Sequence, residues 1–455
     1  MASQAINMKA IKERWGTFVE GEKYGPVIKE AWKRKVTAIL LENTANEIES
    51  ISPELRVGPG QTGFTAEYLK EDAPANQSGA FPNATNLKGF DPILISLVRR
   101  SMPNLIAYDV CGVQPMTGPT GLIFALKSRY TSQGGAEALF YEANTAFSGA
   151  GYGGSQAGVD PAGNSSGLAN STTYTYATGM STLQGEGLGT SGNVSIPEMA
   201  FSIDKVTVTA KTRKLKAEYT IEIAQDLKAV HGLDAETELA NILSAEILAE
   251  INREIIRTIY FSAVRGAQNN TANAGSFDLD TDSDGRWLVE RFKGMAFQIE
   301  REANAIAKAT RRGKGNIVLC NSDVASALVA AEMLHYESAY SAALTVDDMG
   351  STYAGTLMGR YKVYIDPYAP TTDTHHFVVG FRGNSPYDAG LFYCPYVPLQ
   401  MLRAQDPGSF QPKIGFQTRY GVVANPFSNA DGTSDGTVVF NTNQYYRKVR
   451  VLNLL

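Results

Sequence analysis

The sequence predicts an α+β protein, with a mixed α/β arrangement as the alternative. Three observations favour this class: one long amphipathic helix pattern, strand patterns around a glycine-rich excursion, and alternating helix and strand patterns toward the C-terminus. The 455 residues exceed what one hydrophobic core usually serves, so we expect two or three subdomains. With 43% hydrophobic and 19% charged residues, the composition is that of an ordinary globular protein.

The first 71 residues differ from the rest of the chain. They hold ten basic and ten acidic residues. Apolar residues recur at helical spacing around Trp15 and again between Val27 and Glu49, which predicts two charged amphipathic helices. A stretch rich in glycine and proline, Val57–Gly63, follows them. We interpret this region as a detachable unit.

A long excursion is predicted between residues 134 and 192. This segment holds 14 of the 43 glycines, and no Lys or Arg occurs between Tyr130 and Lys205. A loop of this length is rarely a structureless part of a compact domain. Apolar and polar residues alternate in Gly121–Tyr130, around Phe201 to Val208 and again from Tyr219 to Ile223, which predicts flanking strands. We therefore expect a flap that becomes ordered on neighbouring molecules.

The clearest helix is predicted from its N-cap Asp234 to about Arg265, because Leu and Ile recur every four residues. At about 1.5 Å per residue it would be roughly 40 Å long. The other expected elements are a short helix Asp91–Arg100, a helix from Trp287 to Arg311, a strand Asn316–Cys320, a helix Ser322–Glu332, and strands Tyr361–Ile365, Phe377–Gly380, Ile414–Val423 and Tyr446–Leu452.

Charge, hydropathy and cysteines exclude several classes. A formal net charge of −5 argues against a general nucleic-acid binder, which needs a basic surface. We recognise no secretory signal, and no stretch approaches the roughly 20 apolar residues that span a bilayer. Cys111, Cys320 and Cys394 lie far apart in apolar stretches, so we expect buried, reduced thiols.

The most specific motif begins at Asp280. Asp280, Asp282 and Asp284, followed by a glycine, form the pattern with which a calcium loop begins. The twelfth position of such a loop carries a bidentate Glu, but here it is Arg291. The alternative is an acidic turn ahead of a helix, with Asp284 as its N-cap. We expect no cofactor, and these three aspartates are the one candidate metal site that the sequence offers.

Three glutamates lie four residues apart on the predicted long helix: Glu246, Glu250 and Glu254. Such spacing can build a carboxylate metal site in a helical bundle. No Glu-x-x-His accompanies them, however, and Arg253 and Arg257 follow at a distance of three residues. We therefore interpret the glutamates as members of surface ion pairs along the helix.

No pattern indicates an active site. The sequence contains no nucleotide-binding glycine loop, no His-Glu-x-x-His and no nucleophile elbow. The adjacent His375 and His376 are expected in an exposed loop. We predict that the chain is not an enzyme.

Four blocks carry a resemblance to a known family. They are Phe90–Leu126, Lys211–Asn252, Gly359–Tyr368 and Asp406–Phe427. In these blocks, which keep the same order over nearly the whole chain, the sequence strongly resembles the major head protein of T-even-type tailed bacteriophages, in its precursor form. Residues 134–200 differ from the insertion found in such heads.

The resemblance implies a Hong Kong 97-like capsid fold. Its expected parts are a cleaved propeptide (1–71), an N-arm (72–107), a P-domain (108–283) with a spine helix (234–265) and an E-loop (130–204), an A-domain (284–403), and return strands to the P-domain with the C-terminus (404–455).

The resemblance also implies proteolytic processing, because the family loses its propeptide to a prohead protease that cuts after Leu/Ile-x-Glu. Leu69, Lys70 and Glu71 match this pattern at the composition boundary, so cleavage is expected between Glu71 and Asp72. The match Leu40–Glu42 lies inside a predicted helix and would be a poorer substrate.

The implied function is assembly of hexameric capsomers into a head shell that encloses double-stranded DNA without binding it specifically. The implied partners are further copies of the chain, scaffold or core proteins, the prohead protease, vertex and portal proteins, and decoration proteins, but no membrane. The expected location is the virion, assembled in the bacterial cytoplasm. One alternative is an encapsulin-type nanocompartment shell of the same fold. Another, from a different class, is a calcium-dependent glycan-binding surface protein.

Overall fold

The computed structural model describes residues 11–12, 15–16, 19, 28, 30–51, 105–139, 147–149, 179–190, 195–268, 271–283, 287–336, 352–368, 375–406, 408, 411–429 and 435–454. The chain divides into two units, one made of Met1–Leu122 with Thr207–Leu455 and the other of Ile123–Val206. The helix expected at Asp91–Arg100 lies outside the described residues.

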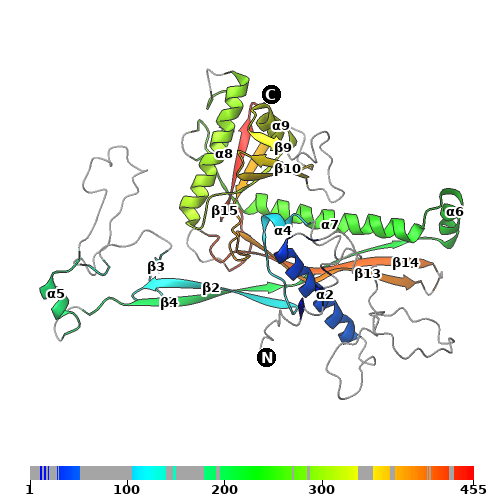
Figure 1. Ribbon diagram of the computed structural model, residues 1–455, viewed down its shortest axis with the longest axis horizontal. Coiled ribbons are helices and arrows are strands. Elements are labelled where there is room, and N and C mark those ends of the chain that lie inside the picture. Colours follow the sequence, from blue (N-terminus) through cyan, green and yellow to red (C-terminus); the bar gives the residue numbers. More distant parts are fainter. Residues whose placement is uncertain are drawn as a thin grey trace, which may run out of the picture. The chain divides into compact units, whose positions relative to one another are not determined.

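The first unit contains a four-stranded sheet with a long helix packed on it (Figure 1). Its strands, in spatial order, are β1 (Gly112–Val113), β13 (Leu391–Gln405), β14 (Pro412–Ala424) and β5 (Lys211–Glu218). The helix α7 (Ala235–Ser262) contacts β14 and β5. It buries Leu243, Ile247, Ile251, Ile255 and Ile259 at four-residue spacing, because that spacing places them on one face.

The same unit contains an eight-stranded sheet. Along it lie β6 (Ala263–Arg265), β15 (Asn443–Leu452), β12 (His375–Gly380), β8 (Ile317–Cys320), β11 (Tyr361–Ile365), β10 (Thr352–Leu357) and β9 (Leu334–Tyr336), and β7 (Ser276–Asp278) also pairs with β15. The helices α8 (Leu288–Thr310) and α9 (Ser322–Ala330) pack on it. The C-terminal strand β15 therefore belongs to this sheet, whereas β14 belongs to the four-stranded one.

The second unit is built on a three-stranded sheet, in the order β3 (Glu137–Ala138), β2 (Thr120–Tyr130) and β4 (Met199–Thr209), with the short helix α5 (Thr182–Gly187) between β3 and β4 in the chain. The strands β2 and β4 confirm that two strands carry the glycine-rich excursion. The mixture of separate helices and mostly antiparallel pairs confirms the α+β class.

Three local predictions were wrong, and the long helix, confirmed with its N-cap Asp234, ends slightly earlier than expected. The strand expected through Tyr219–Ile223 is instead the start of helix α6 (Ile221–His231), because the Thr220 hydroxyl accepts a hydrogen bond from the Ile223 N–H and Gly232 ends the helix with φ of 67°. The long helix ends at Ser262, and its last expected residues form β6. The N-cap of α8 is Trp287 rather than Asp284. The His375–His376 pair begins β12 instead of lying in a loop.

The N-terminal region contributes to the core of the first unit. The helix α2 (Ala31–Ile51) contacts β13, and Trp15, Leu40 and Leu41 belong to the same buried cluster as α4 (Ala107–Val110). The three cysteines are buried and free, as predicted. The helix predicted at Val27–Glu49 is thus confirmed with shifted ends.

Candidate assembly surfaces

The predicted processing residues cannot be located on the fold. Leu69, Lys70, Glu71 and Asp72 lie outside the described residues, and so does Asp284. The match Leu40–Glu42 lies within α2, as predicted, and Leu40 and Leu41 are fully buried.

The two described aspartates of the Asp280 motif are engaged by the protein itself. Asp280 accepts a 2.5 Å hydrogen bond from Arg291, and both carboxylate oxygens of Asp282 accept bonds from backbone N–H groups, those of Ala272 and Asp278. Among the described residues, no group of three His, Cys, Asp or Glu side chains is placed to hold a metal ion. This geometry is that of a tied acidic turn ahead of α8.

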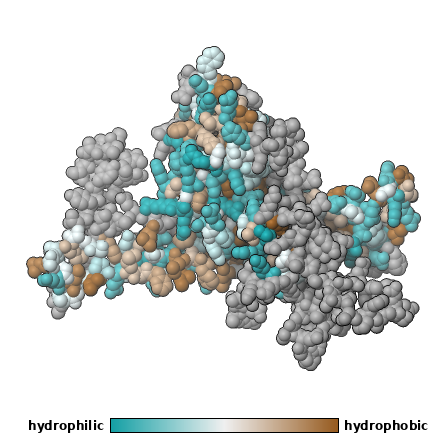
Figure 2. Space-filling model, in the orientation of Figure 1, coloured by the Kyte–Doolittle hydropathy of each residue, from teal (hydrophilic) through white to brown (hydrophobic). Residues whose placement is uncertain are grey.

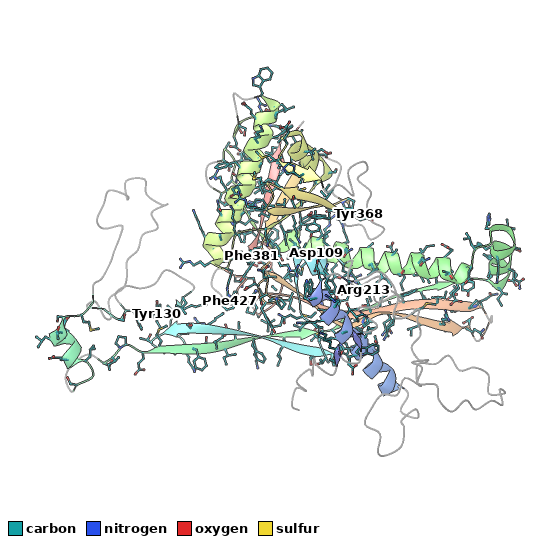
Figure 3. The ribbon with its side chains drawn as sticks, viewed as in Figure 1. Asp109, Tyr130, Arg213, Tyr368, Phe381 and Phe427 are labelled. Atoms are coloured by element: carbon teal, nitrogen blue, oxygen red, sulfur yellow. The ribbon has the colours of Figure 1, made fainter. Side chains whose placement is uncertain are left out.

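The glutamates of α7 have tertiary partners. Arg213 of β5 donates to Glu250 across 2.9 Å and to Glu254 across 2.5 Å, and the Tyr420 hydroxyl of β14 also donates to Glu254 (Figure 3). The cluster fixes the helix to the sheet. The ion pairs predicted within the helix were therefore assigned to the wrong arginines, since Arg253 instead binds Asp366.

The second unit exposes a row of large apolar side chains. On β2, Phe124 and Leu126 are exposed, while their neighbours Ile123 and Ala125 are buried. The row continues on β4 and the adjoining segments with Ile196, Met199, Phe201 and Ile203. Figure 2 shows hydrophobic residues gathered along these strands. We call the side chains of Phe124, Leu126, Met199, Phe201 and Ile203 the apolar strand face.

The opposite side chains of these strands hold the pair together. Lys127 is 1% exposed and its ammonium lies 2.5 Å from the Asp204 carboxylate. Arg129 donates to the Ser202 hydroxyl and to the Gly135 carbonyl. A buried charge is tolerated only when it is paired. These contacts therefore stabilise the burial of Lys127 on one side of the strands, while the apolar strand face stays exposed on the other side.

A second surface is covered by α2. The Asn43 side-chain amide donates to the carbonyls of Met116 and Tyr396, at 2.7 and 3.0 Å. The Trp32 ring lies 5.5 Å from the Tyr108 ring and 4.9 Å from the Arg382 guanidinium carbon. We call the residues under the helix, Tyr108, Met116, Arg382 and Tyr396, the α2-covered surface.

Lys33, the residue next to Trp32 in the first turn of α2, adds an ion pair to these contacts. Its ammonium lies 3.2 Å from the Asp109 carboxylate (Figure 3). The Lys33 side chain is 12% exposed and the Asp109 side chain is 31% exposed. Burial also raises the pKa of the Tyr108 hydroxyl well above its usual range. The α2-covered surface is therefore a packed, dehydrated contact.

Sequence reasoning located neither surface fully. Alternation in Gly121–Tyr130 predicted a strand but did not show that its exposed side would be the more apolar one. The charged composition of the first 71 residues indicated a separate unit, although α2 packs in the core of the first unit. The signal available was the apolar spacing from Val36 to Leu41, which an isolated surface helix would not need.

Comparison with known proteins identifies relatives over nearly the full length. A family model described as "Major capsid protein Gp23" matches residues 87–451. The major capsid protein of Serratia phage KSP90 is 39% identical, with 91% of this chain and 96% of that protein covered. The major capsid protein of Enterobacteria phage T4 is 34% identical, with 98% and 99% covered. The capsid vertex protein of the same phage is 27% identical over 264 residues, 55% of this chain and 58% of that one.

A solved structure titled "The capsid of Myoviridae Phage XM1" has a TM-score of 0.38 and 9% identity, over 77% of this chain and 92% of the other. The described chain contains a long helix on a sheet, a second sheet with two helices and a strand-carried excursion. These elements agree with the α+β capsid fold that the resemblance predicted. Among the described helices, none has the length and hydropathy of a membrane span.

The family model and the full-length relatives show that the chain belongs to the Gp23 family, the structural major capsid proteins of phage virions.

Proposed function

We propose that copies of this chain associate into hexameric capsomers that tile a head shell around double-stranded DNA. The observation that carries the proposal is the apolar strand face. A monomer that remained alone would expose Phe124, Leu126, Phe201 and Ile203 to water on a sheet of only three strands. Contiguous exposed apolar side chains of this kind mark interaction sites.

The energetic gain from covering this face is sizeable. Each of its side chains is between 56% and 68% exposed. Burying this exposed part against a neighbour contributes roughly 1–2 kcal/mol per side chain. Repeated in every subunit of a closed lattice, such contacts offset the entropy lost on association. A second copy of the chain is the proposed partner because family members form shells.

Substitution in the apolar strand face tests the proposal. Phe124→Asp with Ile203→Asp places two charges where a neighbour would be buried, and the chain itself should still fold because both side chains point to solvent. Gln225→Asp, at an exposed polar position of α6, is the control for an added charge. Electron microscopy of particles formed with the scaffold should show shells for the parent and the control only. Normal shells from the double variant would contradict the proposal.

We also propose that the precursor is matured by removal of residues 1–71, with cleavage between Glu71 and Asp72. This segment includes α2, so cleavage would detach the helix from the α2-covered surface. The loss of its contacts with Asp109, Met116 and Tyr396 would then change which packing of subunits has the lowest free energy.

Intact-mass measurement on shells made with the prohead protease tests this step. The expected mature N-terminus is Asp72. A mature chain that begins elsewhere, or that keeps α2, would contradict the cleavage site while leaving the shell proposal intact.

The proposed parts of the subunit keep the expected boundaries: an N-arm at 72–107, a P-domain at 108–283 with the E-loop at 130–204, an A-domain at 284–403, and the C-terminal region at 404–455. The four-stranded sheet with α7 supports a P-domain and the eight-stranded sheet supports an A-domain. Two departures from these ranges occur: β13, nearly all within 284–403, joins the first sheet, and β6 and β7, within 108–283, join the second. Within the C-terminal region, β14 joins the first sheet and β15 the second, so this region would link both domains.

A further inference from the structure

One face of the eight-stranded sheet carries a concentration of basic residues. On β15, Val449 and Val451 are buried on the side packed by α8. Because side chains alternate along a strand, Lys448 and Arg450 point to the other face. Their neighbours on that face are also basic.

These neighbours lie directly opposite across the strand ladder. Arg265 of β6 is the partner of Lys448, and His376 of β12 is the partner of Arg450. Lys448 and Arg265 are therefore like charges directly opposite each other, an arrangement that destabilises a sheet. Burial and then the charge of Arg265 lower the pKa of Lys448. The fold therefore keeps cations together at a cost.

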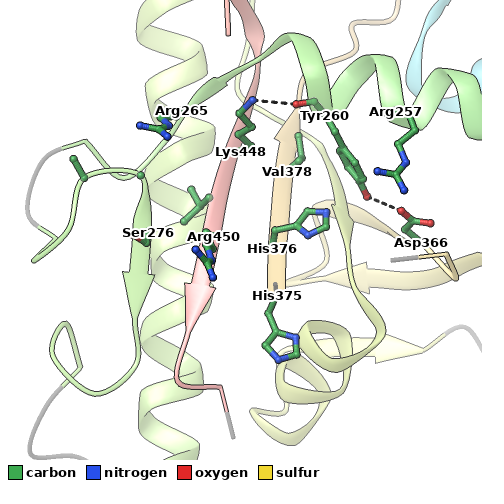
Figure 4. A pocket seen from close by; sticks show the side chains of 13 residues that line it. Arg257, Tyr260, Arg265, Ser276, Asp366, His375, His376, Val378, Lys448 and Arg450 are labelled. Carbon is green, nitrogen blue, oxygen red and sulfur yellow. Dashed lines mark hydrogen bonds between the residues drawn. The ribbon is translucent and has the colours of Figure 1, made fainter. Parts of the chain in front are cut away.

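The basic residues line one cavity of about 470 Å³, to which α7 adds Arg257 (Figure 4). One carboxylate belongs to its described lining, that of Asp366, and it already accepts two hydrogen bonds from Arg253 and one from the Tyr260 hydroxyl. In the part of the chain that the structure describes, no carboxylate lies within 4.0 Å of the cationic groups of Arg257, Arg265, Lys448 or Arg450.

We propose that this cavity, which we call the basic pocket, is a binding site for a phosphate group. Cations supplied by three elements surround it, and a phosphate brings more charge and more acceptor oxygens than a single carboxylate. The planar guanidinium groups of three arginines suit such a ligand, because each can donate two hydrogen bonds to phosphate oxygens. The source is either a backbone phosphate of enclosed DNA or a free phosphate.

The formal net charge of −5 does not oppose this assignment, because it averages over the whole chain whereas the pocket gathers its cations locally. A single phosphate contact per subunit would also carry no sequence information, since such contacts position nucleic acid without reading bases. Only the DNA source rests on the proposed function; the pocket itself does not.

The first test measures thermal unfolding of the unassembled full chain in rising inorganic phosphate at constant ionic strength. Phosphate should raise the unfolding temperature of the parent, because a ligand of the folded state stabilises it. Arg265→Gln and Arg450→Gln should each weaken phosphate binding about tenfold. Lys362→Gln removes one exposed charge from β11 of the same sheet and should behave as the parent.

A structural role predicts a different pattern. Without phosphate, Arg265→Gln should unfold at the same temperature as the parent or higher, because it relieves the repulsion with Lys448. If that variant is less stable than the parent without phosphate, or if all four proteins respond equally to phosphate, the proposal is wrong.

The second test distinguishes the two sources. If a short DNA duplex competes with phosphate for binding to the parent, and the Arg450→Gln variant no longer binds the duplex, the site belongs to nucleic acid. Response to inorganic phosphate alone would assign it to a free phosphate. Binding of a glutamate-rich peptide in place of either would overturn the proposal in favour of a carboxylate ligand. Shell formation is scored separately by microscopy, so loss of assembly and loss of phosphate binding remain distinguishable.

Discussion

Arg213 of β5 donates a hydrogen bond of 2.5 Å to Glu254 of α7 and thereby joins the long helix to the four-stranded sheet. Its second N–H group reaches Glu250 at 2.9 Å, and its Nε donates to the Tyr420 hydroxyl. Burial lowers the pKa of Arg213, but the hydrogen bonds to Glu254 and Tyr420 outweigh it and the pKa is raised. The guanidinium therefore stays charged and holds two elements that are distant in sequence.

Arg213→Ala should destabilise the chain by about 1–2 kcal/mol. The loss is smaller than for a fully buried pair because Arg213, Glu250 and Glu254 are each at least a third exposed and water screens them. Chemical denaturation of the unassembled chain measures the change. Lys214→Ala, the exposed next residue of the strand, should leave the midpoint unchanged. An equal loss in both variants would show that the cluster contributes nothing specific.

This cluster shows what sequence could and could not predict. Helical spacing located the glutamates on one helix, and i to i+3 spacing offered Arg253 and Arg257 as partners. The fold instead brings Arg213 to them and sends Arg253 to Asp366, 113 residues away in the chain. Whether a glutamate pairs with an arginine on its own helix or with a distant one depends on tertiary packing. The spacing of residues within the helix does not contain that information.

Elements with strong periodicity were predicted closely, because periodicity reports burial of one face. The strand Tyr361–Ile365 and the helix from Trp287 agree with the structure to within a residue or two. The strand expected at Tyr219–Ile223 failed because alternation over five residues is too short to outweigh a Thr N-cap and a Gly end. The resemblance supplied the family, while the two assembly surfaces could be recognised only in the structure.

Asp366 is a second link between α7 and the eight-stranded sheet. It is 2% exposed and accepts hydrogen bonds from Arg253 at 2.7 and 3.0 Å and from the Tyr368 N–H. Asp366→Ala should cost about 3–5 kcal/mol, because it leaves the guanidinium of Arg253 without its counter-charge. Denaturant titration measures the loss. The exposed Asp226→Ala on α6 is the control, and a loss below that of Arg213→Ala would contradict the importance given to burial.

Gly266 is required by a close approach. A Cβ at this position would lie 2.6 Å from a Glu302 carboxylate oxygen and 2.6 Å from the Val449 side chain. Glu302 cannot easily move, since it accepts hydrogen bonds from the Ala267 N–H and from Gln298. Gly266→Ala should therefore destabilise by about 1–3 kcal/mol. Gly185→Ala, where a Cβ would meet nothing within 4 Å, should not destabilise. Equal thermal stability of the two variants would refute the steric argument.

The cysteines should be inert in the folded chain. Burial raises the pKa of the thiols of Cys111, Cys320 and Cys394 to about 12. At pH 8 only about one thiol in ten thousand would be ionised, and the thiolate is the reactive form. A thiol-specific chromogenic reagent should thus label none in native protein and three in denaturant. Rapid native labelling would show that one of these sites opens to solvent.

Asn43 offers a test of whether α2 stabilises only the precursor and not the processed chain. Its amide donates to the carbonyls of Met116 and Tyr396, and its side chain is buried, so Asn43→Ala leaves two carbonyls without these donors. The precursor should lose about 1–3 kcal/mol. Lys35→Ala, on the exposed side of α2, should lose nothing measurable.

The decisive comparison uses the processed chain. If cleavage detaches α2, protein matured from the Asn43→Ala precursor should have the same unfolding midpoint as protein matured from the parent, since neither retains the substituted residue. A difference between the two matured proteins would mean that the helix stays bound to the α2-covered surface after cleavage, because only a retained α2 could transmit the substitution to the rest of the fold.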